Sequence, residues 1–293
     1  MFLPRTDLAL EAAALTDRKD NGVLEGVETD EYSKHGVKVT CVKVINTEGE
    51  RIIGKAIGSY ITIECESLRD ATDVYDKNAR EIFTEELKKV LSPYKPKSIF
   101  VLGLGNRYVT PDSLGPRVTE NINVQSQNPA LCCVSPGVLG ITGIESVDIA
   151  EGITERIKPD VVIAIDALAS RSMHRICTTI QIADTGITPG AGVGNRQKAL
   201  NKETLGVPVI AIGVPTVVDA STVANDSAQH ILEAMGEDAE NPLFDENKRY
   251  AIIKKILNPF FGELIVTPSQ IDCVITKVSN LISDGINDLE NNL

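Results

Sequence analysis

The chain has 293 residues, of which 42% are apolar and 24% are charged, the ordinary composition of a globular protein with a large core. Its formal net charge of −12 repels nucleic-acid backbones, and 4% aromatic residues with no Trp offer few surfaces on which bases could stack. We therefore expect no direct contact with nucleic acid.

Charged residues interrupt the N-terminal stretch, so it lacks the apolar core of a signal peptide, and no apolar run reaches the length of a membrane span. We expect no membrane partner and, by default, a cytoplasmic location. The six Cys residues form no CxxC pair, which favours reduced, buried thiols over a structural zinc site.

The first part of the chain predicts a helix, a loop and an antiparallel hairpin. Residues 5–16 have helical apolar spacing, and residues 17–36 are polar and contain glycines, which indicates a loop. Alternating apolar residues predict a strand over 37–47 and a return strand over 51–64, joined by a turn at 47–50.

From residue 70 onwards helical and strand patterns alternate. Helical spacing covers residues 70–91, 114–124, 145–157, 215–235 and 267–289. Strand-like apolar runs cover residues 99–102, 131–134, 160–166, 177–183 and 207–212. This order predicts a single α/β domain over residues 1–293, with a mixed, mainly parallel sheet flanked by helices and an additional antiparallel hairpin.

Two of these predicted strands lead to an acidic residue at or beyond their C-terminal ends. The apolar run 99–102 passes through a glycine-rich turn to Asp112, and the run 160–166 ends on Asp166. Because α/β folds place ligands at the carboxyl ends of their strands, we expect these two acids to meet there. Two carboxyl groups held close together cannot both ionise readily, so the pair can supply a general acid and a general base that activate water against an amide.

Other interpretations of these acids stay open at this point. The same pair could hold a divalent metal ion that activates the water, or each acid alone could be a helix cap or a salt-bridge partner. Asp184, at the end of the next predicted strand, is a third candidate.

The glycine-rich segments match no nucleotide-binding motif. The turn at Gly103 and Gly105 lacks the third glycine of a dinucleotide fingerprint, since position 108 is Tyr. The loop from Gly186 to Gly194 is not followed by the GK[ST] of a Walker A motif. It is either a substrate-binding loop or a surface crossing that needs the conformational freedom of glycine.

Four blocks of the sequence resemble the germination protease family of spore-forming bacteria. These blocks are residues 5–9 (RTDLA), 103–116 (GLGN followed by TPDSLGP), 164–171 (AIDALASR) and 178–195 (TTIQI through DTG to GVGN). The resemblance implies an endopeptidase that begins the degradation of small acid-soluble spore proteins during germination. It also implies a zymogen in the developing spore that trims its own N-terminus, a tetramer, and a fold like that of hydrogenase-maturation peptidases and phosphorylases.

The resemblance carries the family's proposed catalytic pair onto Asp112 and Asp166, with no required cofactor, although a divalent metal at these acids stays open. The family's substrate site is an acid, an apolar residue, Ala and, two residues on, Glu, and residues 6–11 (TDLALE) match it. This match predicts self-cleavage between Asp7 and Leu8, with residues 1–7 as the pro-segment. Weaker candidates for substrate contacts are Gly105, Asn106, Asp184 and Gly186. The alternatives are a metal-dependent maturation-type peptidase and a non-catalytic binding protein of the same fold.

Overall fold

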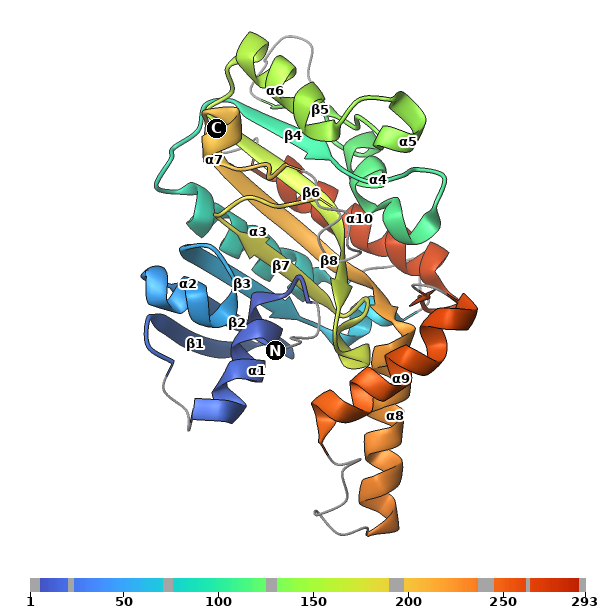
Figure 1. Ribbon diagram of the computed structural model, residues 1–293. Helices are drawn as coiled ribbons and strands as arrows, with labels where there is room; N and C mark the ends of the chain where they lie inside the picture. Colours follow the sequence, from blue (N-terminus) through green and yellow to red (C-terminus); the bar gives the residue numbers. More distant parts are fainter. Residues whose placement is uncertain are drawn as a thin grey trace.

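A computed structural model describes residues 6–20, 24–70, 76–124, 131–189, 198–236, 245–261 and 264–289 of the chain (Figure 1). Its described strands form one continuous mixed sheet in the order β1-β2-β3-β7-β8-β6-β4-β5, with β9 added to β8. The strands are β1 (Val27–Lys34), β2 (Val37–Val44), β3 (Gly58–Glu64), β4 (Ile99–Gly103), β5 (Leu131–Val134), β6 (Val161–Ser170), β7 (Thr179–Ala183), β8 (Val209–Asp219) and β9 (Ile265–Val266). The predicted fold class, a mixed α/β sheet flanked by helices, is confirmed. The sheet is not mainly parallel, however, because three of its described strand pairs are parallel and five are antiparallel.

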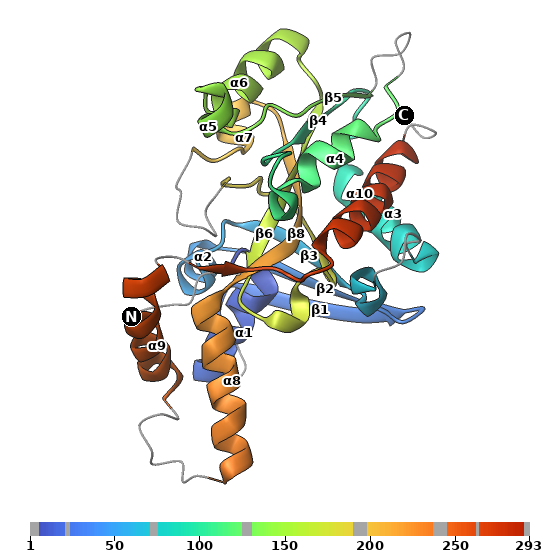
Figure 2. The same cartoon turned by 90° about the vertical axis from the view of Figure 1, so that its right-hand side faces the viewer.

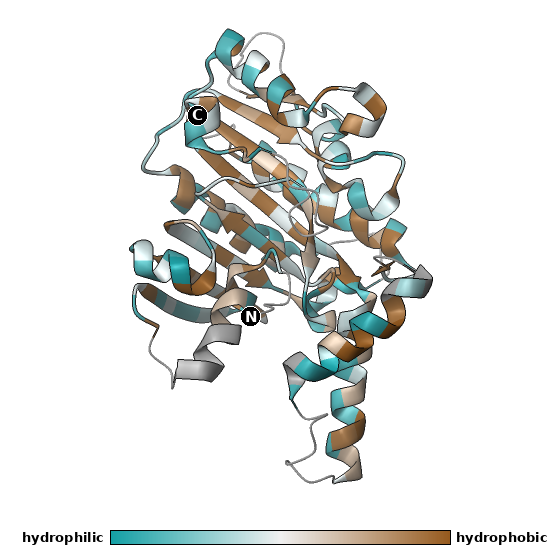
Figure 3. Cartoon of the chain, viewed as in Figure 1, coloured by the Kyte–Doolittle hydropathy of each residue, from teal (hydrophilic) through white to brown (hydrophobic). Residues whose placement is uncertain are grey.

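Half of the sheet is parallel. Strands β5, β4, β6 and β8 are neighbours that run in the same direction. Nearly all residues of β4, β6 and β8 are buried, on both faces of the sheet, which is why these segments are continuous apolar runs in the sequence (Figure 3). Strand β6 continues four residues beyond the predicted end at Asp166, so this acid lies inside the strand.

The other half of the sheet is antiparallel. Two predictions made for this part of the chain are wrong. Residues 47–50 are not a turn, because they begin helix α2 (Thr47–Ile53), which Asn46 caps through the N–H of Gly49 and which Gly54 ends at φ 67°. Strand β3 therefore begins only at Gly58, although it pairs with β2 as predicted. Residues 17–36 are not all loop, because they include the end of α1 (Ala9–Asp20) and strand β1. Strand β1 lies at the exposed edge of the sheet. Its sequence is therefore polar and lacks the apolar pattern from which a strand is predicted.

Helices cover both faces of the sheet, as the edge-on view shows (Figure 2). On one face lie α3 (Lys77–Leu91), α4 (Leu114–Glu120) and α10 (Ile271–Asn287), whose apolar sides form the main core with the strands. The opposite face has two smaller apolar clusters, one under α6 (Ser146–Ile157) and α7 (Lys202–Leu205), the other under α1 and α2. The space between these two clusters is the location of the site described below.

The C-terminal third departs from its prediction in two places. Residues 215–219 are not helical, because β8 continues to Asp219, whose carboxylate caps α8 (Ala220–Met235) through the N–H of Ser221. Helix α9 (Glu246–Phe261) was not predicted; it packs on α8, and the two project from the body of the molecule (Figure 2). The remaining short helices are α5 (Leu139–Thr142), η1 (Glu66–Arg69), η2 (Thr110–Asp112) and η3 (Met173–Arg175). In the described part of the chain, no helix has both the length and the apolar character of a membrane span.

Candidate active site

A cavity of about 750 Å³ lies on the face of the sheet that carries α1. Side chains and backbone from β6, β7 and β8, the end of η2, and the segment after α2 line it. Both predicted catalytic acids, Asp112 and Asp166, are among the lining residues, and so is Asp7. The fold therefore brings three carboxyl groups from distant parts of the sequence to one cavity.

Asp166 is the most deeply buried of the three acids. Its residue is 6% exposed, and its Oδ1 accepts a hydrogen bond of 2.9 Å from the N–H of Ala167. Burial raises the pKa of Asp166 well above its ordinary value, and the negative charges of Asp112 and Asp7 raise it further. Asp166 therefore holds its proton to a higher pH than an ordinary aspartate does.

Asp112 is only partly buried and is held by the glycine-rich turn before it. Its Oδ2 accepts a hydrogen bond of 2.8 Å from the N–H of Asn106. Burial raises the pKa of Asp112, and this hydrogen bond opposes the rise. The two acids thus differ in environment, and Asp112 is the one better suited to carry a negative charge.

Gly105 and Asn106 act on Asp112 and do not line the cavity. Gly105 has φ 108°, and a Cβ at this position would overlap the carbonyl oxygen of Asp112. Asn106 supplies the N–H that binds the Asp112 carboxylate. These contacts position the Asp112 carboxylate, and a contact of Gly105 or Asn106 with substrate stays a prediction.

Asp7 lines the cavity and is paired with β6. The N–H of Asp7 donates to the carbonyl of Ala169 (3.2 Å), and the N–H of Ala169 donates to the carboxylate of Asp7 (2.9 Å). The next two residues, Leu8 and Ala9, are fully buried. The predicted cleavage point therefore joins Asp7, a lining residue of the cavity that contains the two acids, to the buried Leu8.

Two side chains donate to the carbonyl oxygen of Asp7. They are the ammonium of Lys55, at 2.9 Å, and the amide Nε2 of Gln181, at 3.3 Å. Gln181 also accepts a hydrogen bond of 2.8 Å from the N–H of Ala9. Burial lowers the pKa of Lys55, and the charges of Asp7 and Glu11 oppose that shift. Neither residue was predicted as part of the site, because residues 51–64 and 177–183 have only a strand pattern.

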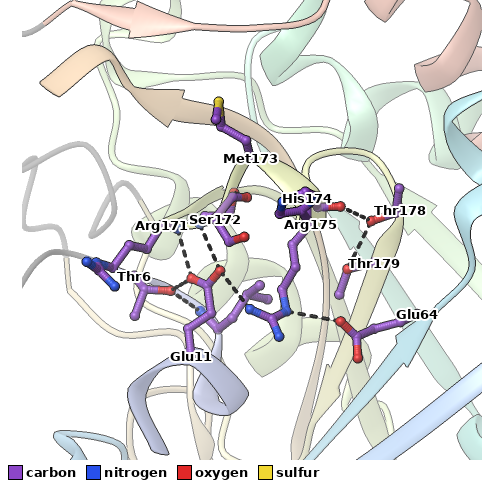
Figure 4. A network of polar contacts seen from close by, with 12 residues as sticks. Thr6, Glu11, Glu64, Arg171, Ser172, Met173, His174, Arg175, Thr178 and Thr179 are labelled. Carbon is purple, nitrogen blue, oxygen red and sulfur yellow. Dashed lines mark hydrogen bonds and ion pairs between the residues drawn. The ribbon is translucent and has the colours of Figure 1, made fainter. Parts of the chain in front are cut away.

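The carboxylate of Glu11, two residues after Ala9, is also buried, and Figure 4 shows its contacts. It accepts hydrogen bonds from the backbone N–H groups of Arg171 (2.8 Å) and Ser172 (3.0 Å) and from the hydroxyl of Thr6. The guanidinium of Arg175 lies 3.4 Å from it.

The last two predicted substrate contacts fall in different places. The carboxylate of Asp184 accepts a hydrogen bond of 2.7 Å from the N–H of Ser59, which ties the end of β7 to β3, and Asp184 is not a lining residue. Gly186 does line the cavity; its φ is 78°, and a Cβ there would overlap the carbonyl of Leu200. The part of the predicted glycine-rich loop from residue 190 to 194 lies outside the described residues.

Comparison with known proteins identifies the family. The model of the germination protease family matches residues 5–244. Germination proteases of Clostridium tetani and Caldanaerobacter subterraneus are 45% and 42% identical to the chain, over 97% of its length and 94% and 93% of theirs. The chain belongs to the germination protease family. The germination protease of Bacillus velezensis, at 40% identity over 98% of the chain, extends the likeness beyond the clostridia.

Membership of the germination protease family makes the chain a peptidase. Among solved structures, a [NiFe] hydrogenase maturation protease, HycI from Thermococcus kodakarensis, matches 69% of this chain and 98% of its own with 18% sequence identity and a TM-score of 0.36. Because the TM-score is this low, we conclude nothing from this match, and the expected relation to maturation peptidases stays a prediction.

Proposed function

We propose that the protein is an endopeptidase that begins the degradation of small acid-soluble spore proteins during germination, and that it is made as a zymogen that cuts itself between Asp7 and Leu8. One observation carries this proposal: Asp7 lines the same cavity as Asp112 and Asp166, and two hydrogen-bond donors bind its carbonyl oxygen. The spore-protein substrate, the tetramer and the location in the developing spore rest on the family resemblance alone.

In the proposed reaction the two acids have separate roles. The Asp112 carboxylate takes a proton from a water molecule, and the resulting hydroxide attacks the carbonyl carbon of Asp7. Asp166, whose raised pKa keeps it protonated, gives its proton to the nitrogen of Leu8 as the bond between Asp7 and Leu8 breaks. The products are a carboxyl group on Asp7 and a free amine on Leu8, and Asp112 now holds the proton taken from water while Asp166 is ionised. Return of that proton from Asp112 to Asp166 restores the pair, so atoms and charges balance.

Lys55 and Gln181 stabilise the oxyanion that forms between these two steps. Both already donate to the carbonyl oxygen on which the negative charge develops. Donors fixed in advance at a developing oxyanion are typically worth a factor of roughly 100 to 1,000 each in rate.

The test is self-trimming of the full chain, followed by intact-mass spectrometry. We expect the wild type to lose residues 1–7, and the variants Asp112→Asn and Asp166→Asn to keep them while retaining the circular dichroism of the wild type. The control is Asp148→Asn, because this carboxylate is half exposed on α6 and pairs with Lys198. Trimming in either test variant at the rate of the control would overturn the carboxylate pair.

A second candidate mechanism uses the same acids to bind a divalent metal. In the described residues no group of three or more His, Cys, Asp or Glu side chains is arranged to hold an ion. Asp112 and Asp166 alone could give such an ion two oxygen ligands, with water supplying the rest. Loss of self-trimming on exhaustive chelation, with recovery on adding Mg²⁺ or Zn²⁺, would favour this mechanism, whereas unchanged trimming favours the carboxylate pair.

A further inference from the structure

We propose that helix α1 stays docked after the chain has trimmed itself and occupies the place of a substrate, so that the trimmed enzyme cuts other proteins only when α1 moves away. Helix α1 is then an inhibitor that remains tethered to the enzyme. This proposal rests on the proposed function, because it takes the bond between Asp7 and Leu8 as the one that is cut.

The apolar contacts of α1 lie on the retained side of the cut. Leu8, Ala9, Ala12 and Ala13 are at most 9% exposed. The three alanines belong to the apolar cluster that α1 shares with α2 and with strands β2, β3, β7 and β8. Because the hydrophobic effect grows with the apolar area removed from water, cleavage before Leu8 leaves this source of binding intact.

Polar contacts anchor the same segment at two further points. The N–H of Ala9 donates to the Oε1 of Gln181 at 2.8 Å. The buried carboxylate of Glu11 accepts hydrogen bonds from the backbone N–H groups of Arg171 and Ser172, at 2.8 and 3.0 Å (Figure 4). None of these three bonds involves the pro-segment, so all of them outlast the cut.

The cut also creates a charge that favours retention of α1. Hydrolysis leaves an α-amino group on Leu8, and such a group is protonated at pH 7 because its ordinary pKa is about 7.7–8.0. In the proposed reaction Asp166 gives a proton to this nitrogen, so the nitrogen lies within reach of that acid. Asp112 is close enough for its charge to raise the pKa of Asp166. The new ammonium is therefore attracted to the pair of acids.

A substrate protein needs the place that α1 holds. Its cleaved bond must meet the same acids and the same two donors, Lys55 and Gln181, that the chain's own bond meets. The residues after that bond must then lie where residues 8–13 lie, and two segments cannot share one closely packed place. A tethered segment also competes at a high effective concentration, typically millimolar for a short linker. The departure of α1 therefore limits the activity of the trimmed enzyme.

Hydrogen exchange on the trimmed wild type tests whether α1 stays docked. The N–H of Ala12 donates to the carbonyl of Leu8 at 3.1 Å, and a helix of this length is marginal in water unless it packs on the protein. We expect the segment 8–20 to stay protected after trimming. During turnover of an excess of an acetylated nonapeptide that copies residues 5–13 (RTDLALEAA), the segment should lose this protection while α10 keeps its own.

Two variants of α1 measure the inhibition. Ala12→Asp places a charge in the apolar cluster, whereas Ala14→Asp places the same charge on the exposed side of the helix. Both are compared after trimming to completion, as shown by intact mass. We expect kcat/KM for the nonapeptide to be at least tenfold higher in Ala12→Asp than in the wild type, and to change less than twofold in Ala14→Asp.

A free peptide should restore the inhibition that Ala12→Asp removes. The peptide copies residues 8–20 (LALEAAALTDRKD) and is added to the trimmed Ala12→Asp enzyme. It should lower the rate of nonapeptide cleavage, whereas the same peptide carrying the Ala12→Asp substitution should have no effect at the same concentration.

The possible outcomes separate this proposal from the proposed function. A full chain that never trims itself would overturn both. Trimming followed by full exchange of the segment 8–20, or by protection that turnover leaves unchanged, would overturn this proposal alone. So would a kcat/KM in Ala12→Asp at or below that of Ala14→Asp. The exchange experiment uses the wild type, so its result does not depend on how any variant folds.

Discussion

Asp7 and Ala169 are joined by two hydrogen bonds, one from the N–H of Asp7 to the carbonyl of Ala169 and one from the N–H of Ala169 to the carboxylate of Asp7. Ala169 lies on β6 only three residues after Asp166, where the register between β6 and β8 shifts. Such irregularities re-aim a strand next to a functional site. The same short piece of β6 therefore provides an acid and docks the segment that we propose this acid helps to cleave.

Removing the ammonium of Lys55 should slow cleavage without unfolding the protein. In Lys55→Met we expect the self-trimming rate constant to fall roughly 100- to 1,000-fold, because the oxyanion loses a donor. Gln181→Leu should also slow trimming, and it additionally loses the contact with Ala9. The measurement is the rate of loss of residues 1–7 by mass spectrometry. Lys43→Met, on the exposed side of β2, is the control. A Lys55→Met variant that trims as fast as this control would show that Lys55 only docks the segment.

Gly105 should tolerate no side chain. In Gly105→Ala the new Cβ would meet the Asp112 carbonyl at a φ of 108°, so we expect a loss of about 1–3 kcal/mol in the free energy of unfolding and a strong loss of trimming. Gly152→Ala is the matched control. It lies in α6 with nothing within 4 Å of the added Cβ, so it should gain up to about 1 kcal/mol, as alanine does in a helix. Urea denaturation measures both. A Gly105→Ala variant with wild-type stability and trimming would contradict the positioning role.

The sequence predicted the two acids of the cavity because each follows an apolar run that the parallel sheet buries. Each prediction needed only an apolar run and an acid at or after its end, and both features are local, although Asp166 lies inside β6 and not at its end. The start of β1 and the helical character of residues 47–53 could not be predicted in this way. The first depends on a polar edge strand pairing with β2, and the second on one capping asparagine.

The residues that act on the Asp7 carbonyl could not be found from local patterns. Lys55 lies 48 residues from Asp7, and Gln181 lies 174 residues away, and both occur in segments with an ordinary strand pattern. Only the folded chain brings them to one oxygen atom. The contacts of the Glu11 carboxylate are harder still to predict, because two of its donors are backbone N–H groups, which any residue supplies.

The buried carboxyl group of Asp166 should make stability depend on pH. Its pKa is raised in the folded state, whereas the unfolded chain releases the proton near the ordinary value of 3.8. The folded state therefore binds more protons between these two values, and the free energy of unfolding falls as the pH rises through this window. Asp166→Asn removes this term, so its gain over the wild type should be absent below pH 4 and grow as the pH rises.

For Asp160 we expect stability to depend on pH in the opposite direction. Hydrogen bonds from the backbone N–H groups of Lys97 and Ser98 lower its pKa, so its contribution to stability is present above the ordinary pKa and is lost as the pH falls. Asp160→Asn should therefore lose stability at neutral pH and approach the wild type in acid. Urea midpoints at pH 2, 4, 6 and 8, on protein shown intact by mass, test both variants. A gain for Asp166→Asn that does not change with pH would contradict the buried, protonated acid.

The rate of self-trimming should rise and then fall with pH. The reaction needs Asp112 ionised and Asp166 protonated, so the rate rises as the pH passes the pKa of Asp112 and falls as it passes the higher pKa of Asp166. The negative charge of Asp7 contributes to that higher value. In Asp7→Asn this charge is absent while an oxygen remains to accept the Ala169 N–H, so the falling limb should move to lower pH. First-order rate constants from pH 4 to 9 at constant ionic strength measure both limbs. A rate that climbs steadily to pH 9, or a falling limb that Asp7→Asn leaves in place, would contradict the assignment of Asp166 as the proton donor.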